Sequence, residues 1–356
     1  MERTKRIEWV DIVKYVCIIM VMLSHLESRT DIWSAFYTPF FLSGFFFVAG
    51  YVYKPKSSFK DFLYKKIRQL FVPWLVFSVF DIVLSQIITF NEHDSLLEEL
   101  KWNFLQIGGQ GDQIWFVAAL FVAFIPFYFF IRFYESKPQK INGGGYCNKC
   151  VVAIALAWLL SLSSILYTRL VPADIFPWNT TSLPWHIEYM FQAMFYMVLG
   201  YMFRHNMEAE FDKYNTLKLR IVALLAYLVL VFVPFFGKVK MPMVGDILYH
   251  YLTAVVGIAT LILIAKEIKA NRYINYVGQN TLIYFALHGK ALSVIQTLLK
   301  KFAVGFYSAV LNNVALSSVF CLGLSLVLSV ILIVPTYIIN RWFPFIVGRK
   351  SIKIEK

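Results

Sequence analysis

The stretch from Asp11 to His25 reads DIVKYVCIIMVMLSH and places three ionisable side chains, those of Asp11, Lys14 and His25, in an apolar segment of helix length. Such a segment suits a helix that crosses a hydrocarbon layer ~30 Å thick. An ionisable group near the centre of that layer costs about 2.5 to 3.5 kcal/mol and therefore usually faces a partner or a polar cavity. The stretch predicts a membrane helix with one polar face.

Similar apolar runs recur along the 356 residues, of which 59% are hydrophobic and only 15% charged. This composition is typical of a polytopic membrane protein and argues against a soluble globule. We therefore predict an all-α membrane bundle of about ten transmembrane helices, with both termini in the cytoplasm. The predicted spans are residues 9–26, 35–53, 70–90, 113–133, 151–167, 185–203, 221–236, 247–265, 277–298 and 312–339.

The net charge of +13 follows this predicted topology. The segments predicted to lie inside carry 25 of the 34 Lys and Arg residues, and those predicted to lie outside carry 8. An excess of basic residues in cytoplasmic segments is the positive-inside pattern of membrane proteins. The charge is therefore an orientation signal and does not predict a nucleic-acid partner. We expect a multi-pass protein in the lipid bilayer of the cell inner (plasma) membrane.

The chain shows no appended soluble domain, so we predict a single integral-membrane domain over residues 1–356. The first apolar run lacks a small-residue cleavage site and is interpreted as a retained helix. The longest outside loops, residues 91–112 and 169–184, are expected to shape an extracytoplasmic mouth, and the first contains the acidic helical stretch NEHDSLLEEL.

The four cysteines are too few and too scattered for a disulfide scaffold. Cys147 and Cys150 have the spacing of a redox or metal-binding pair, but no second pair or histidine lies nearby. Because a structural zinc site needs four such ligands, we expect no metal.

The ionisable groups of the first helix share one face. His25 lies eleven positions after Lys14, and at ~100° per residue these eleven steps return to within about 20° of the same direction. Asp11, three residues before Lys14, lies on that face as well. A simpler interpretation is open: Asp11 and Lys14 lie near the inner interface, where Lys14 can snorkel, and His25 marks the outer end of the helix.

Five later segments carry motifs that belong with this helix. They are FYTPFFLSGFFFVAGYVY from Phe36, KKIRQLFVPW from Lys65, QIWFVAALF from Gln113, and the pair LPWHIEYMFQAMFYMVLGYMFR and VGQNTLIYFALH, which begin at Leu183 and Val277. Together with the first helix they resemble the acyltransferase-3 family of bacterial integral-membrane O-acyltransferases. The family's first helix carries a basic residue, ten intervening residues and a histidine, matched here by Lys14 and His25. Lysine replaces the usual arginine at Lys14 and at Lys65, so a bidentate anion contact is not expected there.

The resemblance implies the transfer of an acyl group, most often acetyl from acetyl-CoA, onto a hydroxyl of a cell-surface or exported glycan. It thus implies acetyl-CoA as the acyl donor and a glycan or lipid-linked sugar as the acceptor. Some family members carry a fused extracytoplasmic domain, so a separate extracytoplasmic partner or a homo-oligomer is an open question.

The chemistry needs a base that takes the proton of the hydroxyl, and a histidine with a pKa of ~6.5 suits this role near neutral pH. We assign His25 as the first catalytic candidate and His288 as the second, with Asp11 beside Lys14 on the polar face of the first helix. Asn280, Tyr284 and His288 are spaced by four residues and form a second polar stripe that could orient the acyl carbonyl. The alternative for His288 is a hydrogen-bonded packing residue.

Binding roles follow from charge and ring chemistry. Lys65 and Arg68 match the family's basic pair and are expected to bind the phosphates of the donor, with Lys14 deeper along the same route. Positive-inside topology alone also explains a basic loop. Trp115 and Glu188 are expected on the acceptor side, as are His186 and Trp178, although burial is a common use of tryptophan.

Two further alternatives remain. A transporter of a sugar, a lipid-linked glycan or an acyl group also places charges inside a helical bundle. Within the enzyme class, an O-succinyltransferase would use the same residues, and the acyl group could pass directly or through an acyl-histidine.

Overall fold

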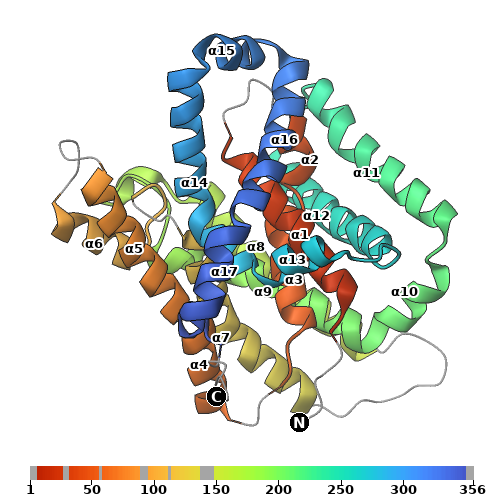
Figure 1. The fold of residues 1–356 in the computed structure, drawn as a ribbon. Coiled ribbons are helices and arrows are strands. Elements are labelled where there is room, and N and C mark those ends of the chain that lie inside the picture. Colours follow the sequence, from red (N-terminus) through yellow and green to blue (C-terminus); the bar gives the residue numbers. More distant parts are fainter. Residues whose placement is uncertain are drawn as a thin grey trace, which may run out of the picture. The chain divides into compact units, whose positions relative to one another are not determined.

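The computed structural model describes residues 6–26, 32–55, 58–88, 95–110, 114–136 and 148–349. These residues form helices and turns and contain no strand (Figure 1). Eight helical stretches are long and apolar enough to cross a membrane. The predicted class, an all-α polytopic membrane bundle, is therefore confirmed, whereas the side on which the termini lie stays a prediction.

The chain folds into two compact units, each built from two separate segments. Unit 1 comprises Met1–Val48 and Ala209–Tyr337, and unit 2 comprises Ala49–Glu208 and Ile338–Lys356. The single domain over residues 1–356 stays a prediction.

Unit 1 is organised around the first helix. Its elements are α1 (Glu8–Ser24), α2 (Ile32–Tyr37), the start of α3 (Phe41–Tyr51), α10 (Glu208–Tyr214), α11 (Leu217–Phe236), α12 (Met243–Ala265), α13 (Arg272–Gln279), α14 (Thr281–Phe302), α15 (Val304–Asn312), α16 (Val314–Ile331) and most of α17 (Ile333–Trp342). The helix α1 packs against α12, α13, α14 and α16. A Cβ atom at Gly278 of α13 would lie 2.2 Å from the backbone oxygen of Asp11, so only glycine permits this close approach.

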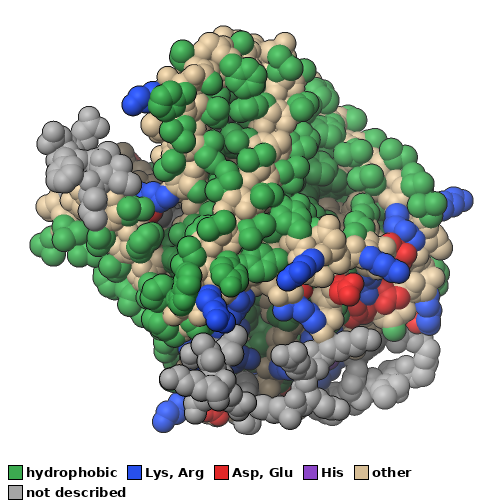
Figure 2. All heavy atoms as spheres, viewed as in Figure 1, with side chains coloured by type: hydrophobic (Ala, Val, Ile, Leu, Met, Phe, Trp, Pro, Cys, Tyr) green, Lys and Arg blue, Asp and Glu red, His purple; other side chains and the backbone are tan. Residues whose placement is uncertain are grey.

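One end of unit 1 gathers charged side chains. Lys266 lies 2.7 Å from Asp212, Arg220 lies 3.3 Å from Glu267, and the Lys266 ammonium lies 5.4 Å from the ring centroid of Trp9. Figure 2 shows charged side chains beside α10 and α13, whereas the visible surface of α14 to α16 is largely hydrophobic. The segments predicted inside the cell, around residues 204–220 and 266–272, thus meet at one end of the unit.

Unit 2 surrounds α9. Its elements are the end of α3, α4 (Phe59–Lys66), the π-helix η1 (Ile67–Phe71), α5 (Val72–Ile88), α6 (Leu96–Leu105), α7 (Trp115–Ser136), α8 (Asn148–Leu170), the 3₁₀-helices η2 (Ala173–Ile175) and η3 (Pro184–Tyr189), α9 (Met190–Met202), the π-helix η4 (Phe203–Met207), the end of α17 and the 3₁₀-helix η5 (Pro344–Val347). The helix α9 packs against α7 and α8. A Cβ at Gly50 would lie 1.9 Å from the Met197 backbone oxygen, so α3 also approaches α9 closely.

The helices α7 and α9 run in the same direction. Near their starts, the rings of Trp115 and His186 lie 5.2 Å apart, and near their ends the Tyr201 hydroxyl donates to Glu135. The starts of α7 and α9 therefore lie at one end of unit 2 and their ends at the other. Trp115 and His186 belong to the end that is predicted to face outward.

The third predicted span begins earlier than expected. The apolar stretch runs over Phe59–Gln86, whereas the sequence predicted residues 70–90. Aromatic packing explains the difference, because Phe62 stacks on Tyr128 of α7 and the Lys66 ammonium lies 3.2 Å from the centroid of the Phe124 ring. Cation–π contact lets a lysine lie against an apolar helix. The basic segment thus starts this helix and does not form a loop before it.

Two predicted spans are not among the eight stretches. Residues 9–26 form α1, which has 17 residues. Residues 185–203 become α-helical only at Met190, because Trp185 and His186 have φ angles of 62° and 53°. These two crossings stay predictions.

The described part of the acidic stretch, from Ser95 onward, leads into a helix, α6, which Ser95 caps by accepting a hydrogen bond from the Glu98 backbone N–H. Phe104 contacts Trp74 of α5 with ring centroids 5.9 Å apart, and Asn103 is buried. The end of this helix therefore packs against α5, while Leu97 near its start is exposed. Cys147 and the glycine triplet lie outside the described residues.

Candidate functional site

The structure brings together the two histidines that the sequence proposed as catalytic. His25 follows the last residue of α1, and His288 lies two turns into α14. Their ring centroids are 4.8 Å apart and the rings meet edge to face. Residues 263 positions apart in the chain thus form one histidine pair in unit 1.

The tautomer of His288 follows from its hydrogen bond. Its Nδ1 lies 2.7 Å from the backbone oxygen of Phe285, which can only accept. In the neutral ring the proton is therefore on Nδ1, and Nε2 bears the lone pair. That Nε2 atom is buried and has no hydrogen-bond partner in the described part of the chain. His25, by contrast, is exposed. The pair combines a buried proton acceptor with a histidine that a substrate can reach.

Asp11 lies with Lys14 and apart from the histidine pair. Its buried carboxylate lies 3.2 Å from the Lys14 ammonium and accepts a hydrogen bond from Arg6 Nη2 at 3.0 Å. Fourteen residues of helix separate Asp11 from His25, which corresponds to about 21 Å. Asp11 therefore positions the cation of Lys14, and the predicted polar stripe is divided into an ionic end and a histidine end.

The side chains of Asn280 and Tyr284 donate hydrogen bonds to backbone oxygens of unit 1. The Asn280 amide donates to the Tyr276 carbonyl at 2.7 Å, and the buried Tyr284 hydroxyl donates to the Ser329 carbonyl at 3.0 Å. These bonds tie the start of α14 to α13 and α16. The two residues support the helix that carries His288.

The proposed basic pair lies in unit 2 around a π-helical turn. Lys65 is the next-to-last residue of α4 and is exposed, while Arg68 lies in η1 and is half-buried. The π-helix precedes Pro73, which has no N–H to continue a regular helical ladder. Gly348, at φ 68°, packs its Cα against the Arg68 backbone, where a Cβ would lie 2.6 Å from the Arg68 oxygen.

Trp115 and Glu188 both contact His186, in a part of unit 2 other than that of the basic pair. The Trp115 ring contacts the His186 ring, whose Nδ1 lies 3.2 Å from a Glu188 oxygen. Ser182 also donates to Glu188, at 3.0 Å. Sequence reasoning missed Ser182, because a single serine in an irregular loop carries no periodic signal.

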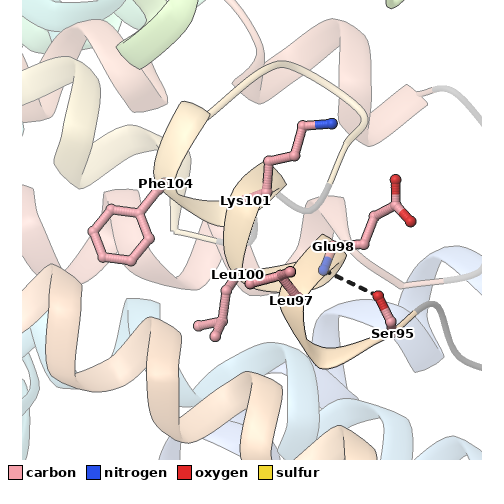
Figure 3. A pocket seen from close by; sticks show the side chains of 6 residues that line it. All are labelled: Ser95, Leu97, Glu98, Leu100, Lys101 and Phe104. Carbon is pink, nitrogen blue, oxygen red and sulfur yellow. Dashed lines mark hydrogen bonds between the residues drawn. The ribbon is translucent and has the colours of Figure 1, made fainter.

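A hollow of about 650 Å³ lies along α6 and is shown in Figure 3. Its lining comes from α6 and the residue before it: Ser95, Leu97, Glu98, Leu100, Lys101 and Phe104. None of the predicted site residues lines it, so we assign no role to it.

Membrane-length helices and a pairing of one exposed with one buried histidine are the features of a multi-pass membrane protein that has groups suited to proton transfer. A family model described as an acyltransferase domain matches residues 7–334. The chain therefore belongs to the acyltransferase-3 family, as its motifs indicate, and is a membrane acyltransferase. Comparisons with curated proteins and with solved structures gave no match.

Proposed function

We propose that the protein transfers an acetyl group from acetyl-CoA onto a hydroxyl of a cell-surface or exported glycan, in the inner membrane. The observation that carries this proposal is the pairing of exposed His25 with buried His288, whose Nε2 offers a lone pair. Family membership supports acyl transfer in general. The donor, the acceptor and the histidine base are tested by the experiment below.

In the proposed reaction the acceptor oxygen attacks the thioester carbonyl while His25 takes the hydroxyl proton. The C–S bond then breaks, and the leaving CoA thiolate takes up the proton that His25 had accepted. His288 lies against His25 and can receive a hydrogen bond or a proton at Nε2. A positioned histidine base contributes typically 10² to 10⁴-fold to such a step.

Cationic side chains are proposed to bind the phosphates of the donor. Lys65 and Arg68 begin a membrane-length helix and so lie where an anionic group can be held close to the bilayer. Lys14 is oriented by Asp11. Asn280 and Tyr284 are proposed to act mainly by supporting α14, because a direct contact with the acyl carbonyl would require them to exchange their present bonds.

The transporter alternative rests on the membrane helices and on charged side chains within the bundle, such as Asp11 and Lys14, which a membrane acyltransferase accounts for equally well. An O-succinyltransferase would use the same chemistry and differs only in the donor. A homo-oligomer or a separate extracytoplasmic partner would extend the reaction without changing the histidine pair.

The first test measures the release of free CoA thiol from acetyl-CoA by the purified protein in lipid vesicles, with extracted cell-envelope glycan as acceptor. We expect thiol release that requires glycan and falls at least 100-fold in His25→Ala. His205→Ala is the matched control, because His205 is a histidine of unit 2 whose Nδ1 lies 2.8 Å from the Tyr201 carbonyl oxygen.

Succinyl-CoA is assayed in parallel. Release only from succinyl-CoA would replace the donor and keep the mechanism. If folded wild-type protein consumed neither donor while moving sugar across the vesicle membrane, the transporter alternative would replace the proposal.

A further inference from the structure

A second group of buried polar side chains lies in unit 2, away from the histidine pair. We call it the Glu188 cluster and define it by Asn103, Gln106, Ser182, His186 and Glu188. Each of these five side chains belongs to a residue that is at most 8% exposed. Buried polar groups are costly unless they are bonded, so such a cluster calls for an explanation.

The Glu188 carboxylate holds the cluster together. It accepts hydrogen bonds from Ser182 Oγ at 3.0 Å and from the Leu183 backbone N–H at 2.9 Å, and it lies 3.2 Å from His186 Nδ1. A carboxylate at Nδ1 fixes the proton there and leaves Nε2 as an acceptor. This is the arrangement by which proteins orient a histidine toward a ligand.

The backbone at this point is strained. Trp185 and His186 both have positive φ angles, 62° and 53°, which non-glycine residues rarely adopt. Such conformations persist where the surroundings over-determine them and are concentrated at functional sites. Here they place the Trp185 ring parallel to Phe71, with centroids 5.7 Å apart, and the His186 ring against Trp115.

The end of α6 completes the cluster. The Gly108 N–H donates to Ser182 Oγ at 2.8 Å, which joins this segment to the Glu188 network. Gln106 donates to the backbone oxygen of Asn103 at 2.6 Å. Asn103 Nδ2 and Gln106 Oε1 are buried without a hydrogen-bond partner in the described residues.

Two polar atoms of α5 are also buried without a hydrogen-bond partner within the described ranges. They are Trp74 Nε1 and Ser78 Oγ, which lie about one turn apart. Trp74 contacts both Trp185 and Phe104 of α6. The region therefore offers amide and indole donors, an amide acceptor and a hydroxyl. A ligand rich in hydroxyl groups, which both donate and accept, matches this mixture.

We propose that the Glu188 cluster binds the acceptor as a neutral sugar, with hydroxyls bonded to His186 and to the amides of Asn103 and Gln106. Trp115 and Tyr189 flank His186, with centroids 5.2 and 6.1 Å away, and offer flat apolar rings for the face of a sugar. The Glu188 charge disfavours the phosphates of CoA here. That the bound sugar is the acceptor of the acyl group rests on the proposed function, whereas the binding of a sugar at the Glu188 cluster does not.

An aromatic side chain lies between the buried histidine and the surface. Tyr189 is 38% exposed, whereas His186, whose ring stacks against it with centroids 6.1 Å apart, is 3% exposed. In this proposal, a sugar reaches His186 Nε2 when the ring of Tyr189 or Trp115 turns aside.

The test measures sugar binding without acetyl-CoA, by saturation-transfer NMR on protein in lipid nanodiscs, since maltoside detergents themselves carry sugar. The probes are the methyl glycosides of glucose, galactose, rhamnose and N-acetylglucosamine. We expect wild-type protein to bind at least one probe, and Glu188→Gln and His186→Ala to weaken that binding at least tenfold. His205→Ala is the matched control and should bind as wild type does.

His25→Ala should keep sugar binding while losing thiol release, so the two proposals fail separately. Thermal unfolding checks each variant, and His186→Gln replaces the alanine variant if that one does not fold. The inference is overturned if no probe binds folded wild-type protein, as expected if the cluster holds only water, or if both variants bind as tightly as wild type.

Discussion

At the residue scale, the structure distinguishes histidines that the sequence leaves alike. His288 and His205 both direct Nδ1 at a backbone carbonyl, of Phe285 and of Tyr201. Only His288 also meets another histidine ring, that of His25, within the described residues. The shared backbone bond is structural, so the distinctive property of His288 is the position of its Nε2 lone pair.

This contrast predicts the effect of replacing His288 by asparagine. The Asn amide can keep the bond to the Phe285 carbonyl but has no atom at the position of Nε2. We expect His288→Asn to lower the rate of CoA thiol release about 100-fold or more, as for loss of a group that takes part in proton transfer. A packing histidine would tolerate this change. His205→Asn, with the same type of bond, should retain wild-type activity.

At the element scale, the closest approach to α1 depends on glycine. A Cβ at Gly278 would lie 2.2 Å from the Asp11 oxygen, so an alanine must push α13 away from α1. Forced overpacking of this kind typically costs about 1 to 3 kcal/mol. The displaced α13 leads directly into α14, so the position of His288 depends on this contact as well.

We therefore expect Gly278→Ala to lower the midpoint of thermal unfolding and to reduce thiol release. Gly323 in α16 is the matched control, because no atom would lie within 4 Å of a Cβ there. Gly323→Ala should leave the midpoint unchanged or raise it, since alanine favours a helix by up to about 1 kcal/mol over glycine. Equal effects of the two substitutions would show that the contact between α13 and α1 is not tight.

At the scale of the whole molecule, hydropathy and charge predicted which segments face the cytoplasm, but not which of these segments meet in space. The basic segments that the positive-inside pattern assigned to the cytoplasm meet at one end of unit 1, through Lys266, Asp212 and Arg220. The histidine pair belongs to unit 1, and the basic pair and the Glu188 cluster belong to unit 2. The orientation of these ends across the membrane is still a prediction.

Labelling with a membrane-impermeant maleimide tests that orientation. Cys17, Cys150 and Cys321 are buried, so a Cys147→Ser background should label little. In that background, Lys238→Cys, between α11 and α12, should be labelled in intact cells. Lys213→Cys, in α10, should be labelled only after the membrane is made permeable. The reverse pattern would show that the predicted topology is inverted.

The sequence by itself determined the membrane class and the family, because hydropathy, charge asymmetry and motif order are local properties of the chain. It also proposed His25 and His288 as the catalytic candidates. It also placed most membrane-length helices, but not the start at Phe59 or the irregular turn at Trp185. Those depend on aromatic contacts with residues far away in the chain.

Only the tertiary structure decided which polar groups meet. It paired His25 with His288, gave Asp11 to Lys14 and not to the histidines, and assembled Ser182, His186 and Glu188. A sequence shows which residues can bear charge or donate a hydrogen bond. Which of these residues become partners depends on how distant segments of the chain pack together. Burial makes an unbonded polar group costly and so favours a packing in which that group is hydrogen-bonded.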